Sequence, residues 1–267
     1  MKVKVGFVGA GNMGAAIMRG IATSRLSENI SLFATDVDEN KLKSLEKIGV
    51  TAVFDTETLI SECKYVFLAI KPQMFDEVLE NYGKYFTEEH IIVSIAAGIT
   101  GEYIKSKTLS DAKVILVMPN TPFLIGEGAT ALAKVNPVTD EEFGFVCDIF
   151  EAGGKTAVVS ENKMKEIIAI NGSSPAFIYL FAKGFVDYAK SVDISEETAK
   201  SLFCKSLIGS AKMITDSGYS IDELIKMVSS PGGTTLKGLD ELYEGNLTEI
   251  VEKCCVACTK RAYELSK

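Results

Sequence analysis

The sequence predicts an α/β fold with a doubly wound parallel sheet over residues 1–158, followed by an all-helical domain over residues 159–267. Up to about residue 158, short apolar runs alternate with stretches of helical spacing. This alternation is typical of parallel strands covered by helices on both faces. After Ser160 the strand signal fades, and roughly four to six helices fill the remainder. The length of 267 residues suits two modest domains.

The expected strands are short apolar runs separated by helical segments such as residues 38–48. They are 3–8, 31–35, 65–70, 91–95 and 114–118, with 129–133 and 156–159 as later additions.

In the second half, Asp193-Ile194-Ser195-Glu196 predicts the start of a helix. Its expected buried face consists of Ala199, Leu202, Phe203, Leu207, Ala211 and Ile214. Residues 176–185 look apolar on all sides, and such a helix needs burial all round. We therefore expect contacts between subunits as well as a core.

The composition excludes several classes of protein. The chain has 28 Lys and Arg against 36 Asp and Glu, and it has no basic run, so nucleic acid and membrane surfaces are poor partners. No apolar run is long enough to span a bilayer, and the start of the chain reads directly into a strand rather than a signal peptide. Six cysteines without a regular framework favour a reduced, cytoplasmic setting.

Cys255 and Cys258 form a CxxC pattern, which metal and redox sites also use. However, Cys254 and Cys258 share one helical stripe with apolar residues, and the single histidine, His90, is distant in sequence. We interpret these cysteines as buried apolar positions and expect no metal site. The stripe also contains Leu247, Ile250, Val251, Ala262 and Leu265.

A glycine-rich motif connects the first strand to the first helix. In Gly9-Ala10-Gly11-Asn12-Met13-Gly14, Gly9 allows a tight turn, Gly11 lets a pyrophosphate approach the backbone, and Gly14 lets the helix pack on the strand. At the first turn of an alternating domain, this motif predicts a Rossmann-type dinucleotide site that includes Asn12 and Met13. A purely structural turn is the alternative.

Asp36 ends the second expected strand, where a carboxylate can accept hydrogen bonds from the adenosine ribose. A carboxylate there repels the extra phosphate of NADP, and the nearest basic residue downstream is Lys41. We expect NADH or NADPH as cofactor, with Asp36 favouring NADH. The alternative is that Asp36 only starts the following helix.

Three further loops follow expected strands, and the ligand crevice of an open parallel sheet lies outside these strand ends. We expect them to line the path of the cofactor, although proline and asparagine also favour ordinary turns. The expected cofactor contacts in these loops are Ala69, Lys71, Pro72, Ala97, Gly98 and Asn120.

Ser229-Ser230-Pro231-Gly232-Gly233-Thr234-Thr235 precedes a run with helical spacing. Bare backbone N–H groups at a helix start, with hydroxyls beside them, suit a small anion. A plain helix cap is the alternative. The sequence has no Ser-His-Asp set, metal cluster or P-loop, so the reaction it favours is one in which the cofactor carries the chemistry.

Six motifs across the chain resemble pyrroline-5-carboxylate reductases: GFVGAGNMG at 6–14, FLAIKPQ at 67–73, SIAAGIT at 94–100, VMPNTP at 117–122, NGSSPAF at 171–177 and SSPGGTT at 229–235. The resemblance implies a Rossmann-type domain followed by a helical dimerisation domain, often assembled into rings of dimers. It also implies reduction of a cyclic imine, 1-pyrroline-5-carboxylate, to L-proline with NADH or NADPH.

The resemblance makes the 229–235 loop the substrate site. Backbone N–H groups of Gly233, Thr234 and Thr235 would hold the carboxylate, and the Thr235 hydroxyl would hydrogen-bond the ring nitrogen as the catalytic group. Ser230 and Gly232 would complete the loop, and Glu161 is a weaker candidate near the substrate.

The chain departs from the family pattern at Asn171, Ser174, Leu116 and Lys183. Thr56 stands near the adenosine ribose where relatives often carry Asn, which, like Asp36, points away from a tight 2′-phosphate site. Two alternatives stay open. One is a 3-hydroxy acid type of dehydrogenase with Lys183 as acid or base, and the other is a non-catalytic cofactor-binding regulator.

Overall fold

The computed structural model describes residues 2–266, and their contacts divide the chain into two compact units. The first unit comprises residues 2–173 with 257–266, and the second comprises residues 174–256. The sequence puts the division after residue 158, the end of the last strand. In the structure, α7 (Met164–Ile167) and a π-helical turn (Ile168–Gly172) pack on the sheet, so they belong to the first unit. The expected domain ends at residues 1 and 267 lie outside the described residues.

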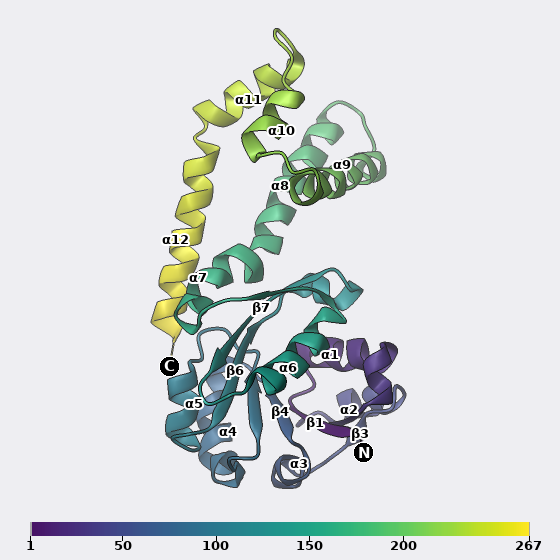
Figure 1. Ribbon diagram of the computed structural model, residues 1–267. Coiled ribbons are helices and arrows are strands. Elements are labelled where there is room, and N and C mark those ends of the chain that lie inside the picture. The colour runs from purple at the N-terminus through teal and green to yellow at the C-terminus, as the bar shows by residue number, and fades with distance from the viewer. Residues whose placement is uncertain (1, 267) are drawn as a thin grey trace. The chain divides into compact units, whose positions relative to one another are not determined.

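The first unit is built on one eight-stranded sheet of order β3-β2-β1-β4-β5-β6-β7-β8 (Figure 1). The strands are β1 (Val3–Val8), β2 (Ile30–Thr35), β3 (Thr51–Ala52), β4 (Tyr65–Leu68), β5 (Ile91–Ser94), β6 (Lys113–Met118), β7 (Gly128–Val135) and β8 (Gly154–Val158). The order reverses between β1 and β4, and this switch point is where doubly wound sheets bind ligands. The predicted α/β fold is confirmed.

Two hydrophobic cores form because side chains alternate across the sheet. On β1, Phe7 lies in the core under α1, α2 and α6, whereas its neighbour Val8 lies in the core under α3, α4 and α5. Phe7 stacks on Phe67 of β4 with ring centroids 4.5 Å apart. The covering helices are α1 (Asn12–Thr23), α2 (Glu39–Glu46), α3 (Thr56–Glu62), α4 (Phe75–Tyr82), α5 (Gly101–Lys107) and α6 (Asp140–Glu151).

The sheet differs from the predicted one in two places. β6 and β7 pair antiparallel, whereas the sequence pattern predicts a parallel sheet. The connection at 119–127, which contains the 3₁₀ turn η4 (Thr121–Ile125), is too short for a parallel crossover of roughly a dozen residues. β3 was not predicted, because two residues leave no detectable alternation.

The second unit is helical, as predicted. Its helices are α8 (Ser174–Ser191), α9 (Glu196–Asp216), α10 (Ile221–Met227) and α11 (Thr234–Glu244), and α12 (Leu247–Leu265) continues from it into the first unit. The α9 start is capped by Ser195, whose hydroxyl accepts from the Thr198 N–H. α8 and α9 pack together through Phe185 and Phe203, whose rings stack at 4.2 Å.

The predicted buried face of α9 is not buried in the single chain. Leu202 is 66% exposed and Ile214 is 52% exposed, and α8 likewise exposes Leu180 and Tyr188. Helical spacing identifies an apolar face but not what covers it. Apolar surface of this extent marks an interaction site. Among residues 2–266, no helix combines the length and hydropathy needed to cross a bilayer.

Candidate functional site

The glycine-rich loop between β1 and α1 has the geometry that the motif predicts. Gly9 adopts φ +103°, and a Cβ there would lie 2.5 Å from the Ala69 carbonyl oxygen. A Cβ on Gly14 would lie 2.8 Å from the Gly9 carbonyl oxygen, so the helix approaches the strand closely. A Cβ on Gly11 would meet only open space. Gly9 and Gly14 therefore allow close packing of the backbone, and Gly11 leaves the backbone open to a ligand.

Asp36 follows β2 and is tied to this loop. Its Oδ2 accepts from the Ala10 N–H at 2.7 Å, and its Oδ1 accepts from the Asp38 N–H at 2.9 Å and from the Lys41 ammonium at 3.2 Å. Partial burial by itself would raise the pKa of Asp36. The two backbone hydrogen bonds and Lys41 outweigh it and hold the pKa below its usual range. The Asp36 carboxylate therefore holds the glycine loop and the start of α2 together through hydrogen bonds.

A cavity of about 300 Å³ lies at these strand ends. It brings together six of the predicted cofactor residues, namely Gly9, Gly11, Asp36, Thr56, Ala69 and Lys71. Asn12, Met13, Gly14 and Pro72 adjoin it in sequence on the same loops but do not line it. Its bare glycine backbone, its carboxylate and its apolar walls fit the adenosine half of a dinucleotide.

One wall of this cavity, formed by α4 and the turn before it, was not predicted from the sequence. Met74, Glu77, Val78, Asn81 and Tyr82 line the cavity at spacings of three and four residues. Val37 also lines it and is 94% exposed. The helical period of α4 could have identified this face, because the helix that follows β4 begins at the switch point.

Ala97, Gly98 and Asn120 follow β5 and β6 and lie outside this cavity. Ala97 is exposed, whereas Gly98 is buried with φ +81°. Asn120 is buried, and its Oδ1 accepts from the Ala129 N–H at 2.9 Å. These loops are at the carboxyl edge of the sheet but do not share one pocket with the glycine loop.

Asn171 has a structural reason for its departure from the family pattern. Its side-chain amide donates to the Met118 carbonyl oxygen at 2.7 Å and to the Ala129 carbonyl oxygen at 3.1 Å. It thereby joins the π-helical turn to the ends of β6 and β7. The family pattern usually has serine at this position, and a serine hydroxyl has one proton and could donate only once. Leu116, another departure, is buried in the core under α5.

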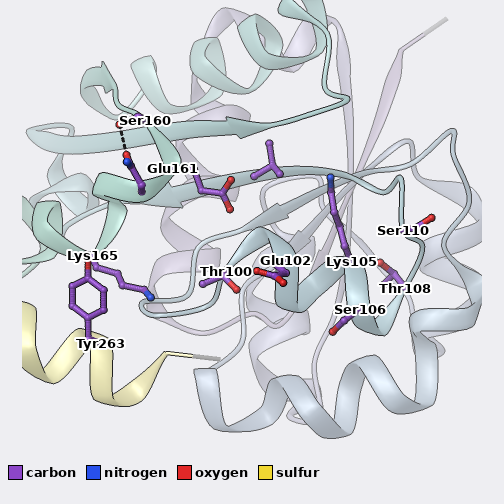
Figure 2. Close-up of a pocket in the computed structure, with 12 residues that line it drawn as sticks. Thr100, Glu102, Lys105, Ser106, Thr108, Ser110, Ser160, Glu161, Lys165 and Tyr263 are labelled. Carbon is purple, nitrogen blue, oxygen red and sulfur yellow. Dashed lines mark hydrogen bonds between the residues drawn. The ribbon is translucent and has the colours of Figure 1, made fainter.

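Glu161 lines a larger and open pocket of about 1170 Å³ (Figure 2). It also lines a small pocket together with Gly98, which follows β5. Its Oε1 accepts from the Gly101 N–H at 3.2 Å. Figure 2 shows it with Lys105, Lys165 and Tyr263, and the Lys165 ammonium lies 4.5 Å from the centre of the Tyr263 ring. Charges of both signs line this pocket, Glu102 and Glu161 on one side of the balance and Lys105 and Lys165 on the other.

In the second unit, the loop before α11 has the predicted form. Gly232 adopts φ +73°, and the Gly233 N–H donates to the Ser230 carbonyl oxygen at 2.9 Å. Gly233 is the N-cap of α11 and has no side-chain cap, so within the described chain the first N–H groups of the helix are left to other partners. Thr234 and Thr235 begin the helix and are exposed.

Two other expectations meet different outcomes. Lys183, the proposed acid or base of the alternative dehydrogenase, is exposed on α8 and forms an ion pair with Asp187. Cys254, Cys255 and Cys258 are half-buried rather than buried. The α12 stripe that contains Cys254 and Cys258 is incompletely covered in the single chain, since its residues Ile250 and Val251 are exposed.

The fold and the glycine loop define the class of protein: a dinucleotide-binding oxidoreductase with a helical second unit. Residues 4–98 match the family model described as NADP oxidoreductase coenzyme F420-dependent, and residues 161–265 match the model described as pyrroline-5-carboxylate reductase dimerisation. A pyrroline-5-carboxylate reductase of Methanosarcina acetivorans is 32% identical over 99% of this chain and 98% of its own. One of Staphylococcus aureus is 35% identical over the same shares. The chain belongs to the pyrroline-5-carboxylate reductase family.

Solved structures of pyrroline-5-carboxylate reductases also match this chain over nearly its full length. A pyrroline-5-carboxylate reductase of Coxiella burnetii has a TM-score of 0.91 and 30% identity, with 100% of both chains covered. The Plasmodium falciparum enzyme, solved with NADP bound, has a TM-score of 0.89 and 28% identity over 99% of this chain and 98% of its own.

Proposed function

We propose that this chain is an NAD(P)H-dependent reductase that converts 1-pyrroline-5-carboxylate to L-proline. The observation that carries the proposal is the full-length match to pyrroline-5-carboxylate reductases, in a chain whose first unit has an open glycine loop at the switch point of its sheet. NADPH or NADH, when bound, supplies the hydride. The chain's own residues bind and orient the two reactants.

The first unit binds the cofactor. The backbone at Gly11, Asn12 and Met13 begins α1 and faces the pyrophosphate, while Gly9 and Gly14 hold the loop against the sheet. Asp36 and Thr56 contact the adenosine ribose. Further along the strand ends, the proposed contacts are Ala69, Lys71, Pro72, Ala97, Gly98 and Asn120.

The second unit binds the imine. The N–H groups of Thr234 and Thr235 donate to the substrate carboxylate at the positive end of α11, where a negative charge is favoured without a cation. The Gly233 N–H joins them by exchanging its hydrogen bond to the Ser230 carbonyl oxygen for one to the carboxylate. Gly232 and Ser230 shape this loop. The Thr235 hydroxyl hydrogen-bonds the ring nitrogen and orients the imine for hydride attack.

A protonated imine already accepts hydride readily, so the reaction needs alignment more than a strong acid or base. Glu161 is a secondary candidate for substrate contact, because its carboxylate is already engaged by the Gly101 N–H. The ion pair of Lys183 with Asp187 and the family membership favour imine reduction over the hydroxy acid dehydrogenase and over the non-catalytic regulator.

The chain self-associates through its helical domain, which the family model describes as a dimerisation domain. The apolar surfaces of α8 and α9 are the proposed contact, and assembly into a ring of dimers is the proposed higher order. We further propose a cytoplasmic setting, where the six free cysteines stay reduced.

The test is a steady-state assay with 1-pyrroline-5-carboxylate and each cofactor, with piperideine-2-carboxylate as a second substrate. We expect saturable oxidation of NADH or NADPH that depends on the five-membered imine. Binding of the cofactor without turnover on either imine would support the regulator instead.

A further inference from the structure

Asp36 is surrounded by protein donors, and this changes what a carboxylate at its position implies. The Asp36 side chain is only 7% exposed, and its two oxygens accept three hydrogen bonds from Ala10, Asp38 and Lys41. A carboxylate has roughly four lone-pair sites, so little acceptor capacity is left for two ribose hydroxyls. The expectation that Asp36 accepts hydrogen bonds from the ribose, and favours NADH by repelling the 2′-phosphate, therefore needs revision.

Lys41 lies where it can act on the same part of the cofactor. It stands on α2, lines the 300 Å³ cavity and has a side chain that is 44% exposed. Its ammonium has three N–H donors, and the described residues engage one of them through Asp36. Because Asp36 marks the ribose 2′ position in this fold, a group 3.2 Å from its Oδ1 is within reach of a substituent at that position.

The charges around the cavity are balanced. Asp36 and Glu77 are offset by Lys41 and Lys71, so the pocket does not present the uncompensated carboxylate that repels a 2′-phosphate. A lysine with a half-exposed side chain can exchange one carboxylate partner for a phosphate, which carries more charge and more acceptor oxygens.

We propose that Lys41 determines cofactor choice, by pairing with Asp36 when NADH is bound and with the 2′-phosphate when NADPH is bound. This inference deepens the proposed function and rests on its cofactor site. The enzyme then accepts both cofactors, and the main role of Asp36 is to fix the glycine loop through its hydrogen bond from the Ala10 N–H. Lys71 also lines the cavity and adds a second positive charge.

The experiment measures binding of NADPH and NADH separately, by fluorescence titration of the full chain without imine, so that it does not depend on catalytic activity. For Lys41→Gln we expect the Kd for NADPH to rise by about tenfold to a hundredfold, the loss of a hydrogen bond between charged groups. The Kd for NADH should change by no more than about threefold. The matched control is Lys43→Gln, an exposed lysine of the same helix that does not line the cavity.

Salt dependence provides a second readout. The NADPH Kd of the wild type should rise more steeply with ionic strength than the NADH Kd, and Lys41→Gln should remove most of that difference. Equal effects of Lys41→Gln on both cofactors, an effect of Lys43→Gln of the same size, or failure of the wild type to bind NADPH would overturn the proposal. Absence of imine reduction with normal binding of both cofactors would contradict the proposed function alone.

Discussion

The two units bury their apolar residues to very different degrees. In the first unit, Phe7, Phe67 and Phe150 are fully buried, and cores fill both faces of the sheet. In the second, α9, α10 and α11 contain no residue that the single chain buries. Both have similar helical patterns in sequence, so the difference lies in what covers their apolar faces. The first unit covers its cores within one chain, whereas the second leaves apolar helix faces exposed, as fits the dimerisation that its family model describes.

The largest expected effect comes from placing a charge on the exposed apolar face. Leu202→Asp should abolish self-association, because burying an unpaired carboxylate costs several kcal/mol. Phe54→Asp is the matched control, since Phe54 is 74% exposed in the first unit. Sedimentation velocity measures the mass in solution of both variants and of the wild type. A Leu202→Asp protein with wild-type mass in solution would show that the comparison between the units is wrong.

Substitutions in the loop before α11 should lower the rate of catalysis without changing the affinity for the cofactor. Thr235→Ala should lower kcat by about tenfold to a hundredfold, the scale of one hydrogen bond to a charged group. NADH affinity should stay within about twofold of wild type. Thr235→Ser keeps the hydroxyl and should retain most of the activity. Full activity in Thr235→Ala would remove the catalytic role from this residue.

Substitutions at Gly14 and Gly11 should have different effects, because Gly14 is needed for packing and Gly11 for cofactor binding. Gly14→Ala puts a Cβ 2.8 Å from the Gly9 carbonyl oxygen and should lower the free energy of unfolding by about 1–3 kcal/mol. Gly11→Ala meets open space, so it should leave the thermal midpoint unchanged and weaken cofactor binding. Calorimetry and cofactor titration on both variants test this; equal thermal midpoints would refute the assignment.

The smallest effect concerns the amide that joins the π-helical turn to the sheet. Asn171→Ala removes two hydrogen bonds and should destabilise the first unit by about 0.5–1.5 kcal/mol. Asn171→Ser should cost less, because one donor remains. Chemical denaturation with both variants gives the comparison, and identical stabilities would show that the amide contacts are not needed.

Much of the first unit could be predicted, because its strands and glycine loop follow local rules. The alternation of Phe7 and Val8, the turn at Gly9 and the order of strands and helices are all visible in the sequence. The antiparallel β7 was not, since strand direction depends on connection length rather than on the strand's own residues.

The site was predicted less completely, for a physical reason. Lys41 and the α4 residues Glu77 and Asn81 join the cavity through tertiary folding. The helical period of α4 identifies one face of that helix, but it does not say which ligand the face meets. The burial expected for Leu202 and Cys258 also failed, because helical spacing reveals an apolar stripe and not its cover. The role of Ser230 to Thr235 in binding the substrate stays a prediction, although the local geometry of this loop has the expected form.

The central claim is hydride transfer to the imine carbon, and isotope transfer tests it most directly. The enzyme would be incubated with 1-pyrroline-5-carboxylate and NADH or NADPH deuterated at C4 of the nicotinamide, and the product analysed by mass spectrometry and NMR. The account predicts L-proline with deuterium at the ring carbon that was the imine carbon. Recovery of unreacted imine with both cofactors, or of proline without deuterium from either face of the nicotinamide, would contradict it.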